Sequence, residues 1–311
     1  MTFDHGASEK PGLQAGVKRA KHDFGAGGAP NSWRGNSGLQ PEVTHRQRRF
    51  GGVARLYGEE GAARLRAAHA AVVGIGGVGS WCAEALARTG VGQITLIDLD
   101  MVAESNANRQ IHALDEVWGR AKVEAMRERI VAINPDCRVH CIEDFVTPEN
   151  VIERLAGDYS VVVDAIDQVR AKVAMIAHCR QRRLPIVVAG AAGGQLDPTR
   201  VTLADLSETI QDPLLAKVRA QLRRDHGFPP GSPRGKKFGV AAVFSTEPLR
   251  YPAGDPSCAV PTGPSGLNCA GFGSSVCVTS VFGMVAAARA IELIVAGKAA
   301  EPKIGIGLRS A

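Results

Sequence analysis

Residues 68–80 read AHAAVVGIGGVGS, an apolar run that ends in a cluster of glycines. An unbroken apolar run of this length is typical of a strand buried on both faces of a parallel sheet. Gly74, Gly76 and Gly79 fit the pattern GxGxxG, and a segment of helical composition begins at Ser80. A strand, a tight glycine turn and a helix in this order predict a site where the backbone can approach a phosphate group.

A second strand is expected at 94–98, and Asp98 at its end lies 19 residues after Gly79. A carboxylate at this position can accept hydrogen bonds from ribose hydroxyl groups. The glycine turn and Asp98 therefore indicate a nucleotide. They do not say which nucleotide, because a nicotinamide dehydrogenase shows the same pattern.

Strands and helices continue to alternate at short intervals along the chain. The expected strands lie at 137–142, 159–164 and 186–189, and the expected helices lie at 80–89, 122–133, 151–155 and 171–182. This alternation predicts an α/β fold with a Rossmann-like, doubly wound and mainly parallel sheet. The later elements are expected to be a strand at 201–206 that runs against the others, a helix at 213–224, a strand at 239–246 and an apolar helix within 272–297.

The composition bears on the kind of protein. The seven cysteines form no CxxC pair, and the chain begins without an apolar leader, which favours the reducing cytoplasm over a secreted disulfide framework or a structural zinc site. The apolar segment 272–297 is interrupted by Arg289 and Glu292, so we expect a helix buried against the sheet and no stable membrane insertion. The net charge of +6 permits a polyanionic partner and does not require one.

Two cations and a further carboxylate distinguish among nucleotides. Arg109 closes the polar segment 105–110, Lys122 opens an expected helix, and Asp167 follows the strand that ends at Asp164. A hydride-transfer site has little use for two cations and an extra carboxylate. A site where a carboxylate attacks the α-phosphate of ATP needs all three. The two cations would neutralise phosphate charge, and Asp167 would hold Mg²⁺.

These segments resemble the E1-like adenylating family, which includes the ThiF and MoeB proteins and the ubiquitin-activating enzymes. The matching segments are VVGIGGVGS at 72–80, LIDLD at 96–100, SNANRQ at 105–110 and DAID at 164–167, together with Lys122. The resemblance implies ATP and Mg²⁺ as cofactors, with catalytic roles for Arg109, Lys122, Asp167 and Arg49 and with Asp167 as the metal ligand. It implies nucleotide contacts for Gly74, Gly76, Gly77, Gly79, Asp98, Asp100, Asn106, Asn108 and Gln110.

The family resemblance also implies a quaternary structure. Such proteins are usually homodimers in which an arginine ahead of the first strand reaches into the partner's site, and either Arg49 or Arg55 would fill that role. Some members bind a monovalent cation, Na⁺ or K⁺, whose ligands cannot be placed in this sequence.

Six further segments resemble the branch of the family that dehydrates threonylcarbamoyladenosine in tRNA. They are RFGGVARLYG at 49–58, NRQIHAL at 108–114, DAIDQVRAK at 164–172, GGQLDPT at 193–199, TIQDPLLAK at 209–217 and VFSTEPL at 243–249. The resemblance implies ATP-dependent cyclisation of N6-threonylcarbamoyladenosine at position 37 of tRNA through an acyl-adenylate.

The resulting domain prediction has three parts. Residues 1–44 form a disordered extension, 45–297 form an E1-like adenylation domain whose part 195–275 faces the substrate, and 298–311 form a tail. The stretch 217–237 carries seven basic residues against Asp225 alone. It either grips tRNA phosphates or is a solvated surface, and both interpretations stay open.

Three alternatives remain. An enzyme that activates the C-terminus of a sulfur-carrier protein would share the site, but such relatives usually carry two CxxC pairs. A nucleotide-binding dehydrogenase leaves Arg109, Lys122 and Asp167 unexplained. A non-catalytic scaffold of a cysteine desulfurase system would not need them intact. The branch carries a cysteine just before VFSTE that this chain lacks, which argues against a covalent role or a sulfur relay at that point. Cys258 and Cys269 are interpreted first as structural or loop cysteines, and a partner from a cysteine desulfurase or sulfur-acceptor system stays open.

Overall fold

The computed structural model describes residues 44–230, 236–250 and 272–297 of the 311-residue chain. The predicted extension at 1–44, apart from Thr44, and the predicted tail at 298–311 lie outside the described residues. So do Cys258, Cys269 and Arg234.

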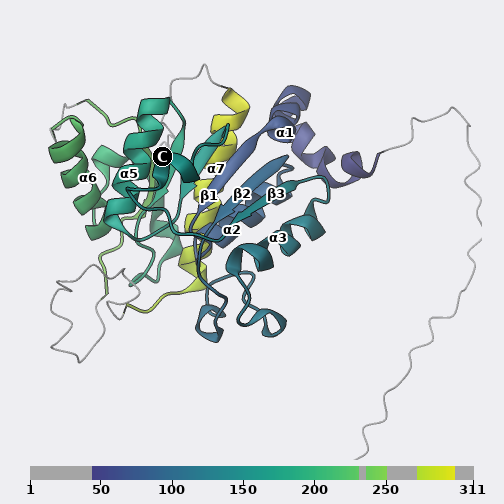
Figure 1. Cartoon of the computed structure of the whole chain (residues 1–311), viewed down its shortest axis with the longest axis horizontal. Coiled ribbons are helices and arrows are strands. Elements are labelled where there is room, and N and C mark those ends of the chain that lie inside the picture. Colours follow the sequence, from purple (N-terminus) through teal and green to yellow (C-terminus); the bar gives the residue numbers. More distant parts are fainter. Residues whose placement is uncertain (1–43, 231–235, 251–271, 298–311) are drawn as a thin grey trace, which may run out of the picture. The chain divides into compact units, whose positions relative to one another are not determined.

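The core of the molecule is a seven-stranded sheet with the order β3-β2-β1-β4-β5-β7-β6. Strands β1, β2 and β3 lie side by side in Figure 1. The strands are β1 His69–Val73, β2 Gln93–Ile97, β3 Arg138–Ile142, β4 Val161–Asp164, β5 Ile186–Ala189, β6 Val201–Asp205 and β7 Ala241–Ser245. All neighbouring pairs are parallel except β6 and β7, which are antiparallel. The predicted mainly parallel sheet is therefore confirmed, and the edge strand β6 runs against the others as expected.

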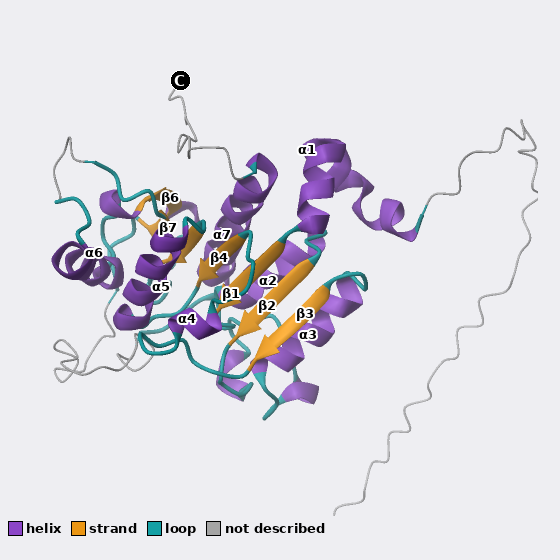
Figure 2. Cartoon of the chain, turned by 45° about the horizontal axis from the view of Figure 1, so that its top comes forward, coloured by secondary structure: helices purple, strands orange, loops and turns teal. Residues whose placement is uncertain are grey.

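Helices cover both faces of this sheet. They are α1 His45–Ala67, α2 Gly79–Arg88, α3 Lys122–Ile133, α4 Val151–Arg154, α5 Val169–Arg182, α6 Pro213–His226 and α7 Val276–Ala296. One face is covered by α2, α3 and α7, with α1 packed on α7, and the other by α4, α5 and α6 (Figure 2).

Alternate side chains of the strands point into two separate hydrophobic cores, one on each face of the sheet. In β1, Ala70 and Val72 face the core beneath α2 and α7, whereas Ala71 and Val73 face the core beneath α5. Because both faces are covered, no strand position needs a polar side chain, which explains the unbroken apolar run before the glycine turn.

The helix α7 is long and apolar enough to cross a membrane by length and composition alone. It packs against α1, α2 and four strands, and 56% of its most apolar window is buried inside the protein. A core helix of a soluble protein passes the same test, and the packing agrees with the predicted buried helix.

The contact between α7 and α2 depends on Gly283. A Cβ atom added at Gly283 would lie 2.5 Å from the carbonyl oxygen of Val78 and 2.8 Å from Cβ of Trp81. We expect Gly283→Val to lower the free energy of unfolding by about 3 kcal/mol, because the two helix backbones must separate. A urea titration measures the effect. The neighbouring change Met284→Ala, at a side chain with 40% exposure, should shift stability by less than about 0.5 kcal/mol. Equal stabilities of the two variants would contradict this account of the contact.

Candidate active site

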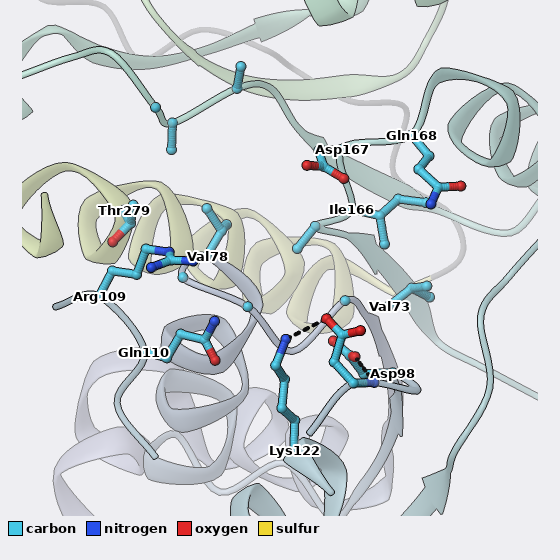
Figure 3. A pocket seen from close by; sticks show the side chains of 18 of the residues that line it. Val73, Val78, Asp98, Arg109, Gln110, Lys122, Ile166, Asp167, Gln168 and Thr279 are labelled. Atoms are coloured by element: carbon cyan, nitrogen blue, oxygen red, sulfur yellow. Dashed lines mark hydrogen bonds and ion pairs between the residues drawn. The ribbon is translucent and has the colours of Figure 1, made fainter. Parts of the chain in front are cut away.

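The strand order reverses between β1 and β4, which places a crevice at the carboxyl ends of the parallel strands. A pocket of about 410 Å³ lies at this edge. The loops that follow β1, β2, β4 and β5 all line it, through residues such as Gly74, Asp98, Asp167 and Ala191. Asp98 and Asp167 are labelled in Figure 3. The polar residues predicted between Asp98 and Asp167, among them Arg109 and Lys122, thus meet in one place.

Each position of the turn requires or permits glycine for a different structural reason. Gly74 has a φ of +87°, and a Cβ added there would lie 2.8 Å from Cγ2 of Ile166. A Cβ at Gly79 would collide with the carbonyl oxygen of Gly74. At Gly76, by contrast, an added Cβ would meet nothing within 4 Å. Gly74 and Gly79 therefore make the turn possible, while Gly76 leaves its pocket side bare for an approaching group. Gly77 also lines the pocket, and Gly79 opens α2 behind it.

Asp98 ties the end of β2 to the glycine turn. Its Oδ2 accepts a 2.6 Å hydrogen bond from the backbone N–H of Ile75, and its Oδ1 accepts one of 2.8 Å from Asp100. Burial raises the pKa of the Asp98 carboxyl, and the Lys122 cation partly offsets this shift. Each carboxylate oxygen of Asp98 can accept a further hydrogen bond, so Asp98 can still bind a hydroxyl group of a ligand in the pocket.

Lys122 enters the pocket between Gln110 and Asp98 (Figure 3). Its Nζ lies 2.7 Å from Oδ2 of Asp100, and its side chain is 7% exposed. The carboxylate of Asp100 is 54% exposed, so it can turn towards solvent when a phosphate competes for Lys122. Lys122, predicted to contact the phosphates, and Asp100, predicted to contact the nucleotide, thus form an ion pair in this structure.

Arg109 lies beside Val78 and Thr279 on the other side of the pocket (Figure 3). Its Nη1 donates to the backbone oxygen of Ser105 and to Oδ1 of Asn108, both at 2.8 Å. Burial lowers the pKa of the guanidinium. Trp81 donates to the backbone oxygen of Arg109, which anchors the loop on α2.

The two predicted asparagines shape this loop. Oδ1 of Asn106 accepts from the N–H of Ala103 at 3.0 Å, and Nδ2 of Asn108 donates to the backbone oxygen of Ser274 at 3.1 Å. Asn106 lines the pocket, and Asn108 does not. The direct nucleotide contact implied for Asn108 stays a prediction, and the structure gives it a second use as a link to the segment before α7.

Two buried polar atoms lie at the pocket without a hydrogen-bond partner in the described part of the chain. They are Oε1 of Gln110 and Oγ1 of Thr279. Gln110 was among the predicted contacts. Thr279 was not, because it lies in a helix that the sequence analysis interprets as wholly structural. The signal that could have indicated Thr279 is its hydroxyl group in the first turn of an otherwise apolar helix. Orphaned donors and acceptors at a pocket wall indicate a polar ligand.

Asp167 lies across the pocket from the glycine turn (Figure 3). Its turn is fixed from below by Asp164, whose Oδ1 accepts from the N–H of Ile166 at 3.2 Å and from Nζ of Lys172 at 2.8 Å. Among the described residues no group of three or more His, Cys, Asp or Glu could hold a metal ion. Mg²⁺ commonly takes one or two carboxylates and completes its shell with phosphates and water, so Asp167 fits that ion only together with a nucleotide.

Neither predicted arginine of α1 lines the pocket of its own chain. Arg49 donates to the backbone oxygens of Ala132 and Ile133, and thereby satisfies free carbonyls at the end of α3. Arg55 makes no such bond to α3. A role for either arginine in a partner's site stays a prediction.

His112 gives the loop after Arg109 a pH-dependent stability. It is 2% exposed, and neither ring nitrogen has a partner among the described residues. Burial, followed by the nearby Lys122 and Arg129 cations, lowers its pKa from 6.5 to about 4. Because the unfolded chain takes up a proton first as the pH falls, stability is lost between about pH 6.5 and 4, by up to about 3 kcal/mol. Urea titrations across this range should show the loss. His112→Leu should remove most of this slope, and an unchanged slope would contradict the assignment.

The family follows from comparison with known proteins. A model described as "ThiF family" matches residues 48–305. The chain belongs to the ThiF family. It is 54% identical over 255 residues to the tRNA threonylcarbamoyladenosine dehydratase of Escherichia coli K12, which covers 80% of this chain and 94% of that protein. It is 46% identical to the Haemophilus influenzae protein of the same name, over 84% of this chain and 98% of the relative.

The solved structures agree. The crystal structure of the E. coli dehydratase TcdA in complex with ATP matches with a TM-score of 0.73 and 50% identity, covering 82% of this chain and 97% of that one. The resemblance to the E1-like family and to its dehydratase branch is therefore confirmed, as is the E1-like α/β fold.

Proposed function

We propose that this protein catalyses the ATP-dependent dehydration of N6-threonylcarbamoyladenosine at position 37 of tRNA. The observation that carries the proposal is the pocket that joins the glycine turn, Arg109, Lys122 and Asp167. It occurs in a chain that aligns over four fifths of its length with a protein named for this reaction. The relative's crystal structure with ATP supports ATP as the co-substrate.

The reaction divides into two steps. The threonyl carboxylate attacks the α-phosphate of ATP, an oxygen–phosphorus bond forms, and pyrophosphate leaves. The carbamoyl group then attacks the activated carbon, loses its proton and closes a five-membered ring while AMP leaves. Adenylation replaces a poor leaving group by a good one, and ring closure gains from proximity. The substrate itself supplies the nucleophile of each step.

The residues of the pocket have distinct tasks in this scheme. Arg109 and Lys122 lie on two sides of the glycine turn and would neutralise phosphate charge as it redistributes. Asp98 would accept ribose hydroxyls, and Gln110 and Thr279 would pair their free polar atoms with the nucleotide. Mg²⁺ at Asp167 would stabilise the negative charge of the departing pyrophosphate.

A thiol intermediate has little support among the described cysteines. Burial raises the pKa of Cys82, Cys141 and Cys179 to about 12 and that of Cys137 to about 11, so these thiols stay protonated. Only Cys277 of the described cysteines is exposed. The proposed reaction needs none of the four thiols whose pKa is raised. A homodimer, a cytoplasmic location and a monovalent cation remain part of the proposal as family properties.

The surface around α6 is the candidate tRNA-binding surface. Several of its cations are already engaged, since Arg224 pairs with Asp225 at 2.8 Å and Lys237 with Glu208 at 3.1 Å. Lys217 is exposed and has no ion-pair partner among the described residues. We expect Lys217→Glu to weaken tRNA binding and to reduce the slope of log affinity against log salt by about 1. Filter binding across a salt series measures both. Arg224→Gln is the matched control, and its effect on tRNA affinity should be smaller. If Lys217→Glu and the wild type show the same tRNA affinity at every salt concentration, Lys217 does not contact tRNA.

Mass spectrometry of nucleosides tests the function. Threonylcarbamoyladenosine-bearing tRNA is incubated with the protein, ATP and Mg²⁺. A nucleoside lighter by one water molecule, with release of AMP, supports the proposal. Unchanged tRNA together with ATP–pyrophosphate exchange in the presence of a sulfur-carrier protein would move the substrate to that protein's C-terminus.

A further inference from the structure

A second cavity lies at the opposite edge of the sheet from the glycine turn. It has a volume of about 280 Å³. Its walls include Ile186 at the start of β5 and Ala241 at the start of β7, so it opens at the amino ends of these two parallel strands. The first pocket lies at the other end of β5, where Gly190 and Ala191 line it. Apolar side chains form its body, among them Leu184, Phe238 and Leu293.

Three arginines line this cavity, and no carboxylate does. Arg180 lies in the last turn of α5, Arg183 is the residue that caps the end of α5, and Arg289 comes from α7. The guanidinium of Arg180 is held 4.1 Å above the ring of Phe228, which limits its freedom. Three positive charges around a small, partly apolar cavity are complementary to an anion with an apolar part.

Arg289 is the strongest single indication that an anion binds in this cavity. Its side chain is 9% exposed, and its Nε has no hydrogen-bond partner among the described residues. Its Nη1 pairs with Glu292 at 2.9 Å, but Glu292 is half exposed and lies outside the cavity lining. Arg289 lies about two turns before the end of α7, so the helix carbonyls that attract cations at a C-terminus do not account for it. A buried donor without a partner at a cavity wall favours an acceptor bound there.

The backbone of Arg183 is a second indication. It ends α5 with a φ of 52° in the left-handed region, where glycine is the usual residue because a side chain is strained there. An arginine in this conformation lowers the stability of the helix end, and the side chain it contributes lines the cavity. Strained residues of this kind cluster at binding sites.

We propose that this cavity binds a phosphate group, either that of a small phosphorylated molecule or one from the tRNA backbone, through Arg180, Arg183 and Arg289. Guanidinium groups bind phosphate through paired, charge-assisted hydrogen bonds. The apolar wall at Leu184, Phe238 and Leu293 would contact the group that carries the phosphate. The site is separate from the nucleotide pocket and shares no lining residue with it.

Thermal unfolding of the full chain in inorganic phosphate, compared with chloride at equal ionic strength, tests the site. We expect phosphate to raise the Tm of the wild type. Arg183→Gly should unfold in chloride at the same or a higher temperature than the wild type, because it relieves the strained backbone. Its phosphate affinity should nevertheless be about tenfold weaker, since one charge-assisted bond is lost. Arg289→Gln should show the same loss of affinity.

Arg182→Gln is the matched control. Arg182 neighbours Arg183 but donates to the backbone oxygen of Leu155 and does not line the cavity. It should keep the full response to phosphate. Binding in the nucleotide pocket contributes equally to all these proteins and cancels in the comparison. A full phosphate response in Arg183→Gly overturns the proposal even if Arg289→Gln fails to fold.

A tRNA-binding measurement identifies the source of the phosphate. If Arg183→Gly loses the phosphate response and binds tRNA with unchanged affinity, the ligand is a small phosphorylated molecule. If its tRNA affinity also falls about tenfold, as expected for one lost phosphate contact, the occupant is a backbone phosphate of tRNA.

Discussion

Arg109→Ala should lower kcat/KM for tRNA dehydration by about a hundred- to a thousandfold, the size of effect seen when one charge-stabilising donor is removed from an active site. The cation lies beside the glycine turn, where a Cβ at Gly77 would be 3.2 Å from Cγ of Arg109. Without Arg109, this cation would no longer stabilise the negative charge that shifts from the α-phosphate to the departing pyrophosphate. Quantifying AMP release and cyclised nucleoside in the same reaction measures the effect.

The control must separate charge from loop structure, because Arg109 also donates to Ser105 and Asn108. Arg109→Lys keeps the charge and should recover part of the rate. Arg120→Ala removes an exposed cation that is paired with Glu128, and its rate should stay within about twofold of wild type because such surface pairs contribute little. If Arg109→Ala folds normally and retains the wild-type rate, Arg109 has no part in catalysis.

The sequence allowed the β1–turn–α2 unit and the two following strands to be predicted closely, because their signals are local. A buried strand, a glycine turn and a helix each leave a pattern within a few residues. The helix at 122–133 and the strand at 186–189 were predicted with the bounds that the structure shows. The antiparallel edge strand β6 was also predicted correctly, since the alternation of strand and helix stops there.

The parts of the site that depend on distant segments could not be predicted. Thr279 enters the pocket from α7, 133 residues or more from every pocket residue in the first half of the chain. Its hydroxyl in the first turn of an apolar helix is a local signal, but that signal does not say which distant segments the hydroxyl meets. The pairing of Lys122 with Asp100 and the bonds of Arg49 to α3 depend equally on packing. The arginine cavity brings α5 and α7 together across the sheet, and no sequence spacing signals it.

Asp167 shows how the fold maintains the chemistry of the site. Its turn leaves the end of β4 directly above the ion pair of Asp164 and Lys172, whose side chains are both fully buried. Burial raises the pKa of Asp164, and the Lys172 cation partly offsets the shift. The orientation of the half-buried Asp167 carboxylate thus depends on an ion pair that lies beneath the pocket and does not line it.

Lys172→Met should therefore be the most destabilising single change considered, lowering the free energy of unfolding by about 3–5 kcal/mol, because it leaves the Asp164 charge buried and alone. Urea titration at neutral pH measures the loss. Without Lys172 the pKa of Asp164 rises further above its unfolded value, so the deficit should be small near pH 4 and grow as the pH rises.

A second change distinguishes the loss of a charge partner from the loss of packing. In Lys172→Met/Asp164→Asn no charge remains buried, so the double variant should recover at least about half of the lost stability at neutral pH. Arg154→Met breaks the partly exposed pair with Asp144 and should change stability by less than about 1 kcal/mol. A double variant no more stable than Lys172→Met would show that the aliphatic stem of Lys172, and not its charge, supports the turn that carries Asp167.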